Sequence, residues 1–339
     1  MAKQQVEPIA ELTLNSYQKT AYITEQPYMN GEDKLIVPLL GLAGEAGELL
    51  AEYKKKLRDA GDHLHFDRRV KEELGDLLWY IANIATKFHL ELGDIAKFNL
   101  EKTQDRWGHG PFEVSAPSFD DNFTDEEKIP RQFTVQIFDT NYKKSLKTML
   151  FSDGLPLGDP LTDNVTVEDG YRFHDVFHLA YAAVLGWSPV TRFLLGVKRK
   201  SSKDYDQNQD GGRAVAIEEG ISALVYSYAE NHHFFKEATA LDYSLLRTIK
   251  DLVAKYEVAP LSSREWQIAI LLGFKVWRIL NENKSGVVSV DMDNRTMEYV
   301  RPLTEEEILE FTQAYPAAKE KKEVLMLERR ARLKALRIK

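Results

Sequence analysis

The sequence predicts a mainly helical protein that combines an all-α N-terminal bundle with a mostly helical α+β C-terminal domain. Three observations favour this fold class. Apolar residues recur every three or four positions over most of the 339 residues. Segments rich in Gly, Pro and polar residues interrupt that pattern after Trp107 and over 153–170. Short runs near 131–140 and 287–300 have the character of strands.

The N-terminal part has the pattern of four helices. Its apolar periodicity is interrupted at 26–31 and 60–63, and the helices are expected near 12–25, 34–58, 67–89 and 91–106. A polar segment with Pro117 and Pro130 follows them. We therefore expect a first domain over 1–110 and a linker over 111–130.

The second domain is expected over 131–315. Residues 131–140 alternate like a strand, and helices are expected over 171–186, 213–236, 242–256 and 262–282. Two runs, 287–290 and 296–300, flank a polar turn and predict a small β-hairpin. Residues 316–339 carry nine Lys and Arg against three Glu and predict a basic amphipathic tail helix. Solvation and oligomer contacts are favoured over nucleic-acid binding for this tail.

Composition excludes several classes of function. Acidic residues number 53 and basic residues 45, a net charge of −8, which disfavours general binding of nucleic acid. The absence of cysteine removes disulfides, thiolate zinc sites and cysteine nucleophiles. Residues 1–30 lack the apolar core of a signal peptide, and no window has the roughly 18 apolar residues of a membrane span. We expect a cytoplasmic protein without membrane contact.

Two pairs of acidic residues indicate metal chemistry. Glu45 and Glu48 are three positions apart, as are Glu73 and Asp76, so each pair lies on one helix face beside leucines. If the leucines pack together, the four carboxylates converge and require a cation. Oxygen ligands alone favour Mg²⁺ or Mn²⁺, which commonly also bind phosphates. The alternative is that each pair belongs to a solvated helix face.

The surrounding sequence resembles the MazG-like all-α nucleoside triphosphate pyrophosphohydrolases. The resemblance rests on Glu-x2-Glu, a gap of 24 residues and Glu-x2-Asp, within the segments GLAGEAGELLAEYKK and EELGDLLWYIANIA. It covers residues 12–107. It implies a helical bundle that works as a dimer or tetramer. It also implies cleavage of an NTP or dNTP to the monophosphate and pyrophosphate.

The resemblance also implies roles for individual residues. Glu45, Glu48, Glu73 and Asp76 would hold Mg²⁺, with Mn²⁺ as an alternative ion. A water attacks phosphorus with one of these glutamates as base, and Glu48 is favoured over Glu45 although spacing does not decide. Substrate contacts are expected from a set of polar residues on the later helices, Asn83, Asn99, Lys102 and Arg106. Lys55 could also reach a phosphate, or could lie on a solvated basic face.

The second domain contains one motif with metal-ligand spacing. His174 and His178 are four positions apart on an expected helix, so their imidazoles share a face. Asp175, Glu218 and Glu219 could complete a mixed site with them. The alternative is that both histidines make hydrogen bonds within the core. This half is similar to C-terminal extensions of some bacterial MazG-like proteins, for which no residue roles carry over.

The predicted function is Mg²⁺-dependent hydrolysis of a nucleoside triphosphate, for nucleotide-pool cleansing or nucleotide depletion. The expected partners are the nucleotide and further copies of the chain. Two alternatives stay open: a nucleotide-binding regulator without turnover, and a bifunctional protein whose second domain is a His/carboxylate metal hydrolase. Base and sugar specificity depend on pocket shape, which the sequence does not show.

Overall fold

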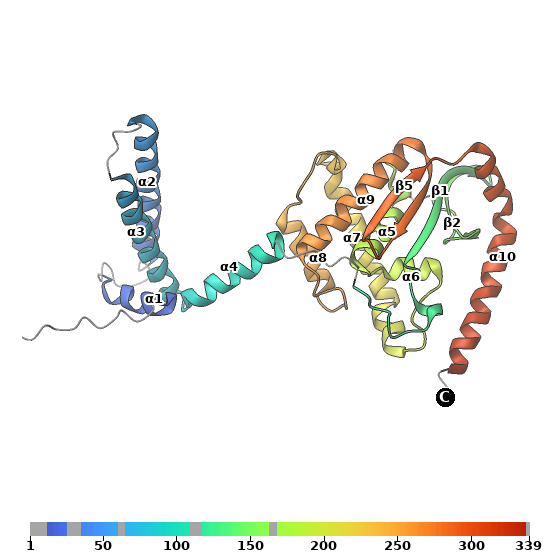
Figure 1. Ribbon diagram of the computed structural model, residues 1–339, viewed down its shortest axis with the longest axis horizontal. Helices are drawn as coiled ribbons and strands as arrows, with labels where there is room; N and C mark the ends of the chain where they lie inside the picture. The colour runs from blue at the N-terminus through green and yellow to red at the C-terminus, as the bar shows by residue number, and fades with distance from the viewer. Residues whose placement is uncertain (1–11, 26–34, 60–64, 109–116, 163–167, 337–339) are drawn as a thin grey trace, which may run out of the picture. The chain divides into compact units, whose positions relative to one another are not determined.

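The structure is a computed structural model that describes residues 12–25, 35–59, 65–108, 117–162 and 168–336. The chain divides into two units, Met1–Gln104 and Asp105–Lys339. Each unit is described by itself, and Figure 1 labels its elements. Among the described residues, no helix is both long enough and apolar enough to cross a membrane.

The first unit is helical, as predicted. Its elements are α1 (Leu14–Ile23), α2 (Ile36–Asp59), α3 (Phe66–Lys87) and α4 (Leu92–Trp107), whose last residues pass into the second unit. The predicted breaks at 26–31 and 60–63 lie outside the described residues. Helices α2 and α3 run side by side, and α1 packs on α3 (Figure 1). Their buried apolar core is small and consists of Ala21, Ala82, Ala85 and Leu92.

The second unit is built on a five-stranded antiparallel sheet in the order β3-β2-β1-β4-β5. The strands are β1 (Gln132–Tyr142), β2 (Ser145–Ser152), β3 (Leu155–Pro156), β4 (Ser285–Asp291) and β5 (Thr296–Arg301). The predicted hairpin is present as β4 and β5, and β1 joins it by pairing with β4. The sheet is larger than the hairpin predicted. The second half of β2 is buried on both faces, so its sequence does not alternate.

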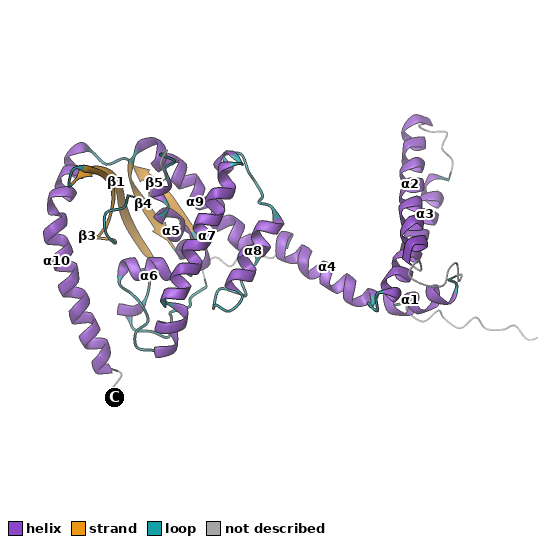
Figure 2. Ribbon diagram, turned by 180° about the vertical axis from the view of Figure 1, so that it is seen from behind, coloured by secondary structure: helices purple, strands orange, loops and turns teal. Residues whose placement is uncertain are grey.

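Helices cover both faces of this sheet (Figure 2). Val135 and Ile137 of β1 belong to the large core formed with α5 (Asp175–Leu185) and α9 (Ser263–Asn283). The next residue, Phe138, faces the other way and packs on Phe311 of α10 (Glu305–Leu336). The period of two along β1 thus places the sheet between two helical layers. The remaining helices are α6 (Pro189–Leu195), α7 (Gly212–Glu230) and α8 (Tyr243–Val253).

Several segments differ from the sequence expectation. Helix α6 was not expected, and the helix expected over 213–236 ends at Glu230 of α7. The helix expected from 171 begins as a short 3-10 turn, Tyr171–Phe173, and α5 follows it. The tail helix expected over 316–339 is part of α10, which begins at Glu305 and continues through Pro316. Packing of Phe311 and Tyr315 against the sheet side holds the helix across this proline.

Buried ion pairs connect the loops of the second unit. Asp120, within the segment expected as a linker, accepts a hydrogen bond from Arg192 at 2.7 Å, and both side chains are buried. Arg199 is buried as well and donates to Asp210 and to Glu257, each at 2.6 Å. These charged side chains are buried away from solvent. Removing a partner therefore leaves buried charge uncompensated and destabilises the fold.

We expect Asp210→Asn to lower the free energy of unfolding of the second unit by about 3 kcal/mol, because the buried Arg199 loses one of its two carboxylate partners and keeps only Glu257. Urea unfolding followed by fluorescence of the buried tryptophans measures this loss. Asp206→Asn is the matched control. Its pair with Lys200 is partly exposed, so the expected loss is about 1 kcal/mol or less. Equal losses in the two variants would contradict the prediction.

Candidate functional sites

Three of the four predicted metal ligands meet between α2 and α3. One carboxylate oxygen each of Glu45, Glu73 and Asp76 lies within 4.8 Å of the other two. Glu48 follows Glu45 by one turn of α2 and is exposed. The side-by-side packing of α2 and α3 therefore turns two local pairs into one acidic cluster, which comprises Glu45, Glu48, Glu73 and Asp76.

The acidic cluster is electrostatically unfavourable without a cation. Partial burial and the negative charges of Glu48, Glu45 and Asp76 raise the pKa of Glu73. The cluster offers only carboxylate oxygens, the ligand type that suits Mg²⁺ and Mn²⁺. Its residues therefore fit a hard divalent cation.

Two further side chains of the first unit, Tyr17 and Asn83, bear on the predicted site. Burial and the charge of Asp76 raise the pKa of Tyr17, so this phenol of α1 lies within the field of the acidic cluster. The sequence analysis did not propose a role for Tyr17. Asn83 is fully buried, and its Nδ2 donates to the carbonyl of Trp79 at 3.0 Å. Its Oδ1 accepts no hydrogen bond from the described residues, which is unusual for a buried amide.

The other predicted substrate contacts lie in different surroundings. The ammonium group of Lys55 pairs with the carboxylate of Glu52, one turn earlier on α2. Asn99 and Lys102 are exposed on α4. Arg106 falls in the second unit, where its guanidinium lies over two aromatic rings. Among these predicted contacts Asn83 is the buried one, and its Oδ1 has no hydrogen-bond partner among the described residues.

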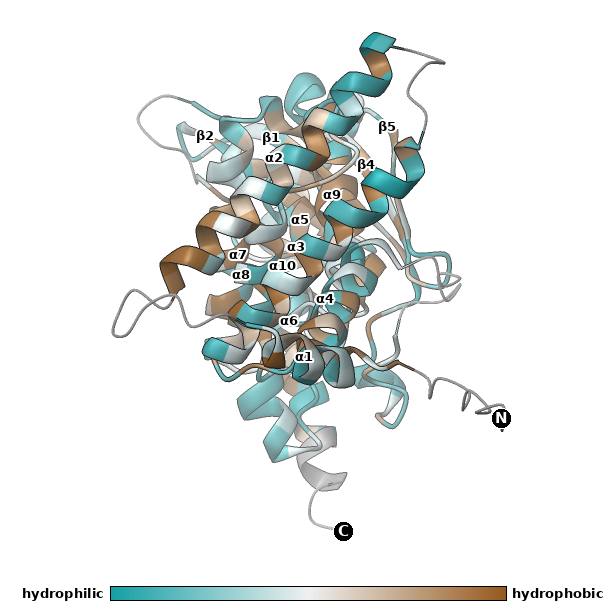
Figure 3. Cartoon of the chain, turned by 90° about the vertical axis from the view of Figure 1, so that its left-hand side faces the viewer, coloured by the Kyte–Doolittle hydropathy of each residue, from teal (hydrophilic) through white to brown (hydrophobic). Residues whose placement is uncertain are grey.

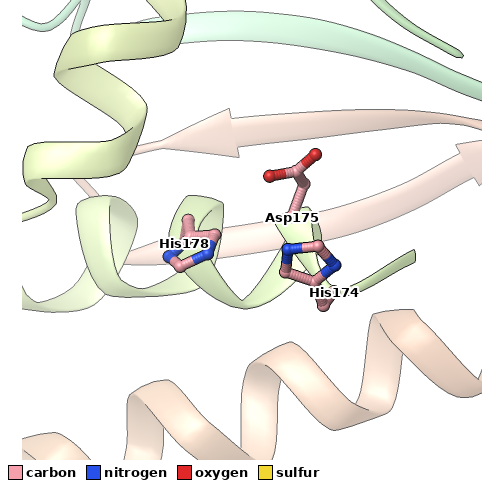
Figure 4. A group of neighbouring side chains, drawn as sticks. All are labelled: His174, Asp175 and His178. Carbon is pink, nitrogen blue, oxygen red and sulfur yellow. The ribbon is translucent and has the colours of Figure 1, made fainter. Parts of the chain in front are cut away.

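The second predicted site is assembled as well, at the start of α5. Ligand atoms of His174, Asp175 and His178 lie within 4.8 Å of one another, and all three residues are buried (Figure 4). Glu218 and Glu219 reach them from α7. We call these five residues the histidine cluster.

Hydrogen bonds hold the histidine cluster in place. His178 Nδ1 lies 2.9 Å from Glu218 Oε1, and its Nε2 lies 3.3 Å from Glu219 Oε2. His174 Nε2 lies 3.6 Å from the same oxygen of Glu219. Glu218 is fully buried and also accepts from the Ser188 hydroxyl and from the backbone amide of Val190. Glu218 and Glu219 were candidates for this site from the sequence, and packing of α5 near α7 brings them to His178.

The two glutamates control the charge of His178. Burial by itself would lower the pKa of this imidazole, but the carboxylates of Glu218 and Glu219 outweigh burial and raise the pKa to about 10. A positive charge at His178 is therefore favoured at neutral pH.

Comparison with known proteins gives matches over both units. Residues 37–110 match the family model described as the MazG nucleotide pyrophosphohydrolase domain, and residues 114–303 match the MazG C-terminal domain. The Gene 37 protein of Mycobacterium phage L5 is 37% identical over 78 residues, which are 22% of this chain and 68% of that protein. No solved structure matches the chain.

We expect Glu73→Gln to stabilise the cation-free first unit by roughly 0.5 kcal/mol, because it removes like-charge repulsion. Mg²⁺ should protect the amides of α2 and α3 in the wild type but not in this variant. Hydrogen exchange of peptides from α2 and α3, in EDTA and in Mg²⁺, measures both effects. Glu72→Gln is the neighbouring control, since Glu72 is exposed and pairs with Arg68. An identical Mg²⁺ response in Glu73→Gln would refute the prediction.

Proposed function

The chain belongs to the MazG nucleotide pyrophosphohydrolase family, and on this premise we propose that it hydrolyses a nucleoside triphosphate to the monophosphate and pyrophosphate. The family makes the chain a hydrolase of nucleotide anhydrides. The observation that supports the proposal is the meeting of Glu45, Glu73 and Asp76 between α2 and α3. Such a reaction serves either cleansing or depletion of the nucleotide pool.

In this proposal the acidic cluster holds the cation and the water. Glu45, Glu73 and Asp76 would bind Mg²⁺, which when bound neutralises negative charge on the phosphate oxygens and on the leaving pyrophosphate. The carboxylate of Glu48 accepts a proton from the attacking water. The water oxygen bonds to phosphorus, the anhydride bond between the α- and β-phosphates breaks, and pyrophosphate leaves.

Residues around the acidic cluster would recognise the nucleoside. The free Oδ1 of Asn83 is suited to accept a hydrogen bond from a hydroxyl or amino group of the nucleotide. Lys55 would contact a phosphate only by leaving Glu52, which makes it the weaker candidate. Asn99, Lys102 and Arg106 remain proposed contacts on the strength of the family resemblance.

The first unit also supports assembly with further copies. Leu40, Leu50 and Leu57 of α2 are 67%, 71% and 70% exposed, and Leu74 of α3 is 51% exposed. The beginning of α2 is hydrophobic (Figure 3). Its residue Ile36 is exposed as well. Exposed apolar surface of this extent marks an interaction site. Because the buried core of the unit is small, a second copy of α2 and α3 would supply the missing burial.

The activity test uses the purified full chain with Mg²⁺ and each common NTP and dNTP, with products separated by chromatography. We expect monophosphate and pyrophosphate. Glu48→Gln and Glu73→Gln should lower kcat/KM by roughly 10²-fold or more, because the base or a cation ligand is lost. Glu72→Gln should retain the activity. Release of single phosphates, or full activity in Glu73→Gln, would overturn the proposal.

Assembly is tested by size-exclusion chromatography of the full chain, with light scattering to measure the mass of the eluted protein. We expect a mass of two or four times the mass of one chain. The double variant Leu50→Glu/Leu57→Glu should shift the population toward monomer, because each charge would be buried in the interface. Leu309→Glu is the control, since Leu309 is 57% exposed on α10, in the other unit. A monomeric wild type would exclude the assembly.

A further inference from the structure

We propose that the second unit binds a divalent first-row transition-metal ion, of the Zn²⁺ or Mn²⁺ class, in the histidine cluster. The ligands are His174 Nε2, His178 Nε2 and the carboxylate of Glu219, with Asp175 beside them. This site is separate from the proposed pyrophosphohydrolase site, since its residues lie in the other unit and include imidazoles.

Hydrogen bonds at Nδ1 orient both imidazoles for metal binding through Nε2. His174 Nδ1 lies 3.0 Å from the carbonyl oxygen of Tyr171, which can only accept a hydrogen bond. His178 Nδ1 is in turn directed at the buried carboxylate of Glu218. In both rings Nδ1 therefore carries a proton, and Nε2 binds a cation after giving up any proton of its own. Carboxylate and carbonyl acceptors behind the ring are typical of metal-binding histidines.

The spacing of the candidate ligand atoms suits one ion. With metal bonds of 2.0–2.2 Å, two ligands of a tetrahedral site lie about 3.4 Å apart. Glu219 Oε2 lies 3.3 Å from His178 Nε2 and 3.6 Å from His174 Nε2. Asp175 lies within 4.8 Å of the histidine ligand atoms and offers a fourth group. Both Nε2 atoms thus lie at the separations from Glu219 Oε2 that one tetrahedral ion requires.

The surroundings make the site rigid on one side and accessible on the other. The ring of Tyr171 stacks on His174, with centroids 4.5 Å apart and an interplanar angle of 4°. His178 and Glu218 are fully buried. The Glu219 side chain is 40% exposed, so an ion can enter from its side. Two imidazoles with carboxylates favour transition metals over Mg²⁺.

Metal binding is measured by calorimetric titration of Zn²⁺ and of Mn²⁺ into the full chain carrying Glu45→Gln/Glu73→Gln. This background removes the acidic cluster as a metal site, so the result does not depend on the proposed function. We expect one ion per chain and at least tenfold weaker binding of Mg²⁺. Adding Glu219→Gln should weaken Zn²⁺ or Mn²⁺ binding at least tenfold. Adding Glu230→Gln, exposed on the same helix, should leave the affinity unchanged.

A second readout uses Co²⁺, whose visible absorption reports nitrogen and oxygen ligands around the ion. We expect Co²⁺ bands in the same background and their loss on His174→Gln. Circular dichroism establishes that the variants are folded. The proposal is overturned if the background takes up none of the three ions, or if Glu219→Gln and His174→Gln bind them as tightly as the background does. In either case the histidine cluster is a set of ion pairs that only joins α5 to α7.

Discussion

A charged side chain can be buried at low cost only where a group of opposite charge pairs with it. This constraint applies to both units. In the second unit, buried Arg192 and Arg199 are met by carboxylates from distant segments, which fixes the loops around the sheet. In the first unit, the groups of the acidic cluster that converge have one sign, and Glu73 is harder to ionise as a result. The same rule stabilises the second unit by pairing opposite charges, and it leaves like charges next to one another between α2 and α3 of the first unit.

The two units also differ in how they bury apolar surface. The second unit has a continuous core with the large side chains of Trp187, Trp266 and Trp277 fully buried beside the sheet. The core of the first unit is mostly alanine, while leucines of α2 and α3 are exposed. The second unit can thus be stable by its own packing. The proposed association would add apolar burial to the first unit, and it would also hold α2 and α3 together against the repulsion between their carboxylates.

The two clusters suit different cations because their donors differ. The acidic cluster offers carboxylate oxygens alone, which favours hard ions that also bind phosphates. The histidine cluster combines imidazole nitrogens with carboxylates and is built into a buried scaffold around His178 and Glu218. The metal site proposed for the histidine cluster therefore differs in its donors from the site proposed for the nucleotide reaction.

Residue spacing is enough to predict the arrangement within each helix. A helical period of 3.6 residues puts Glu45 with Glu48 on one face and Glu73 with Asp76 on another, and it places the two histidines one turn apart. Contacts between different elements depend instead on packing. Packing placed Glu45 with the α3 acids, buried Asn83 with no partner for its Oδ1 among the described residues, and brought α7 to the histidines. It also added two strands and extended α10 through a proline, because packing on the sheet outweighs local preference.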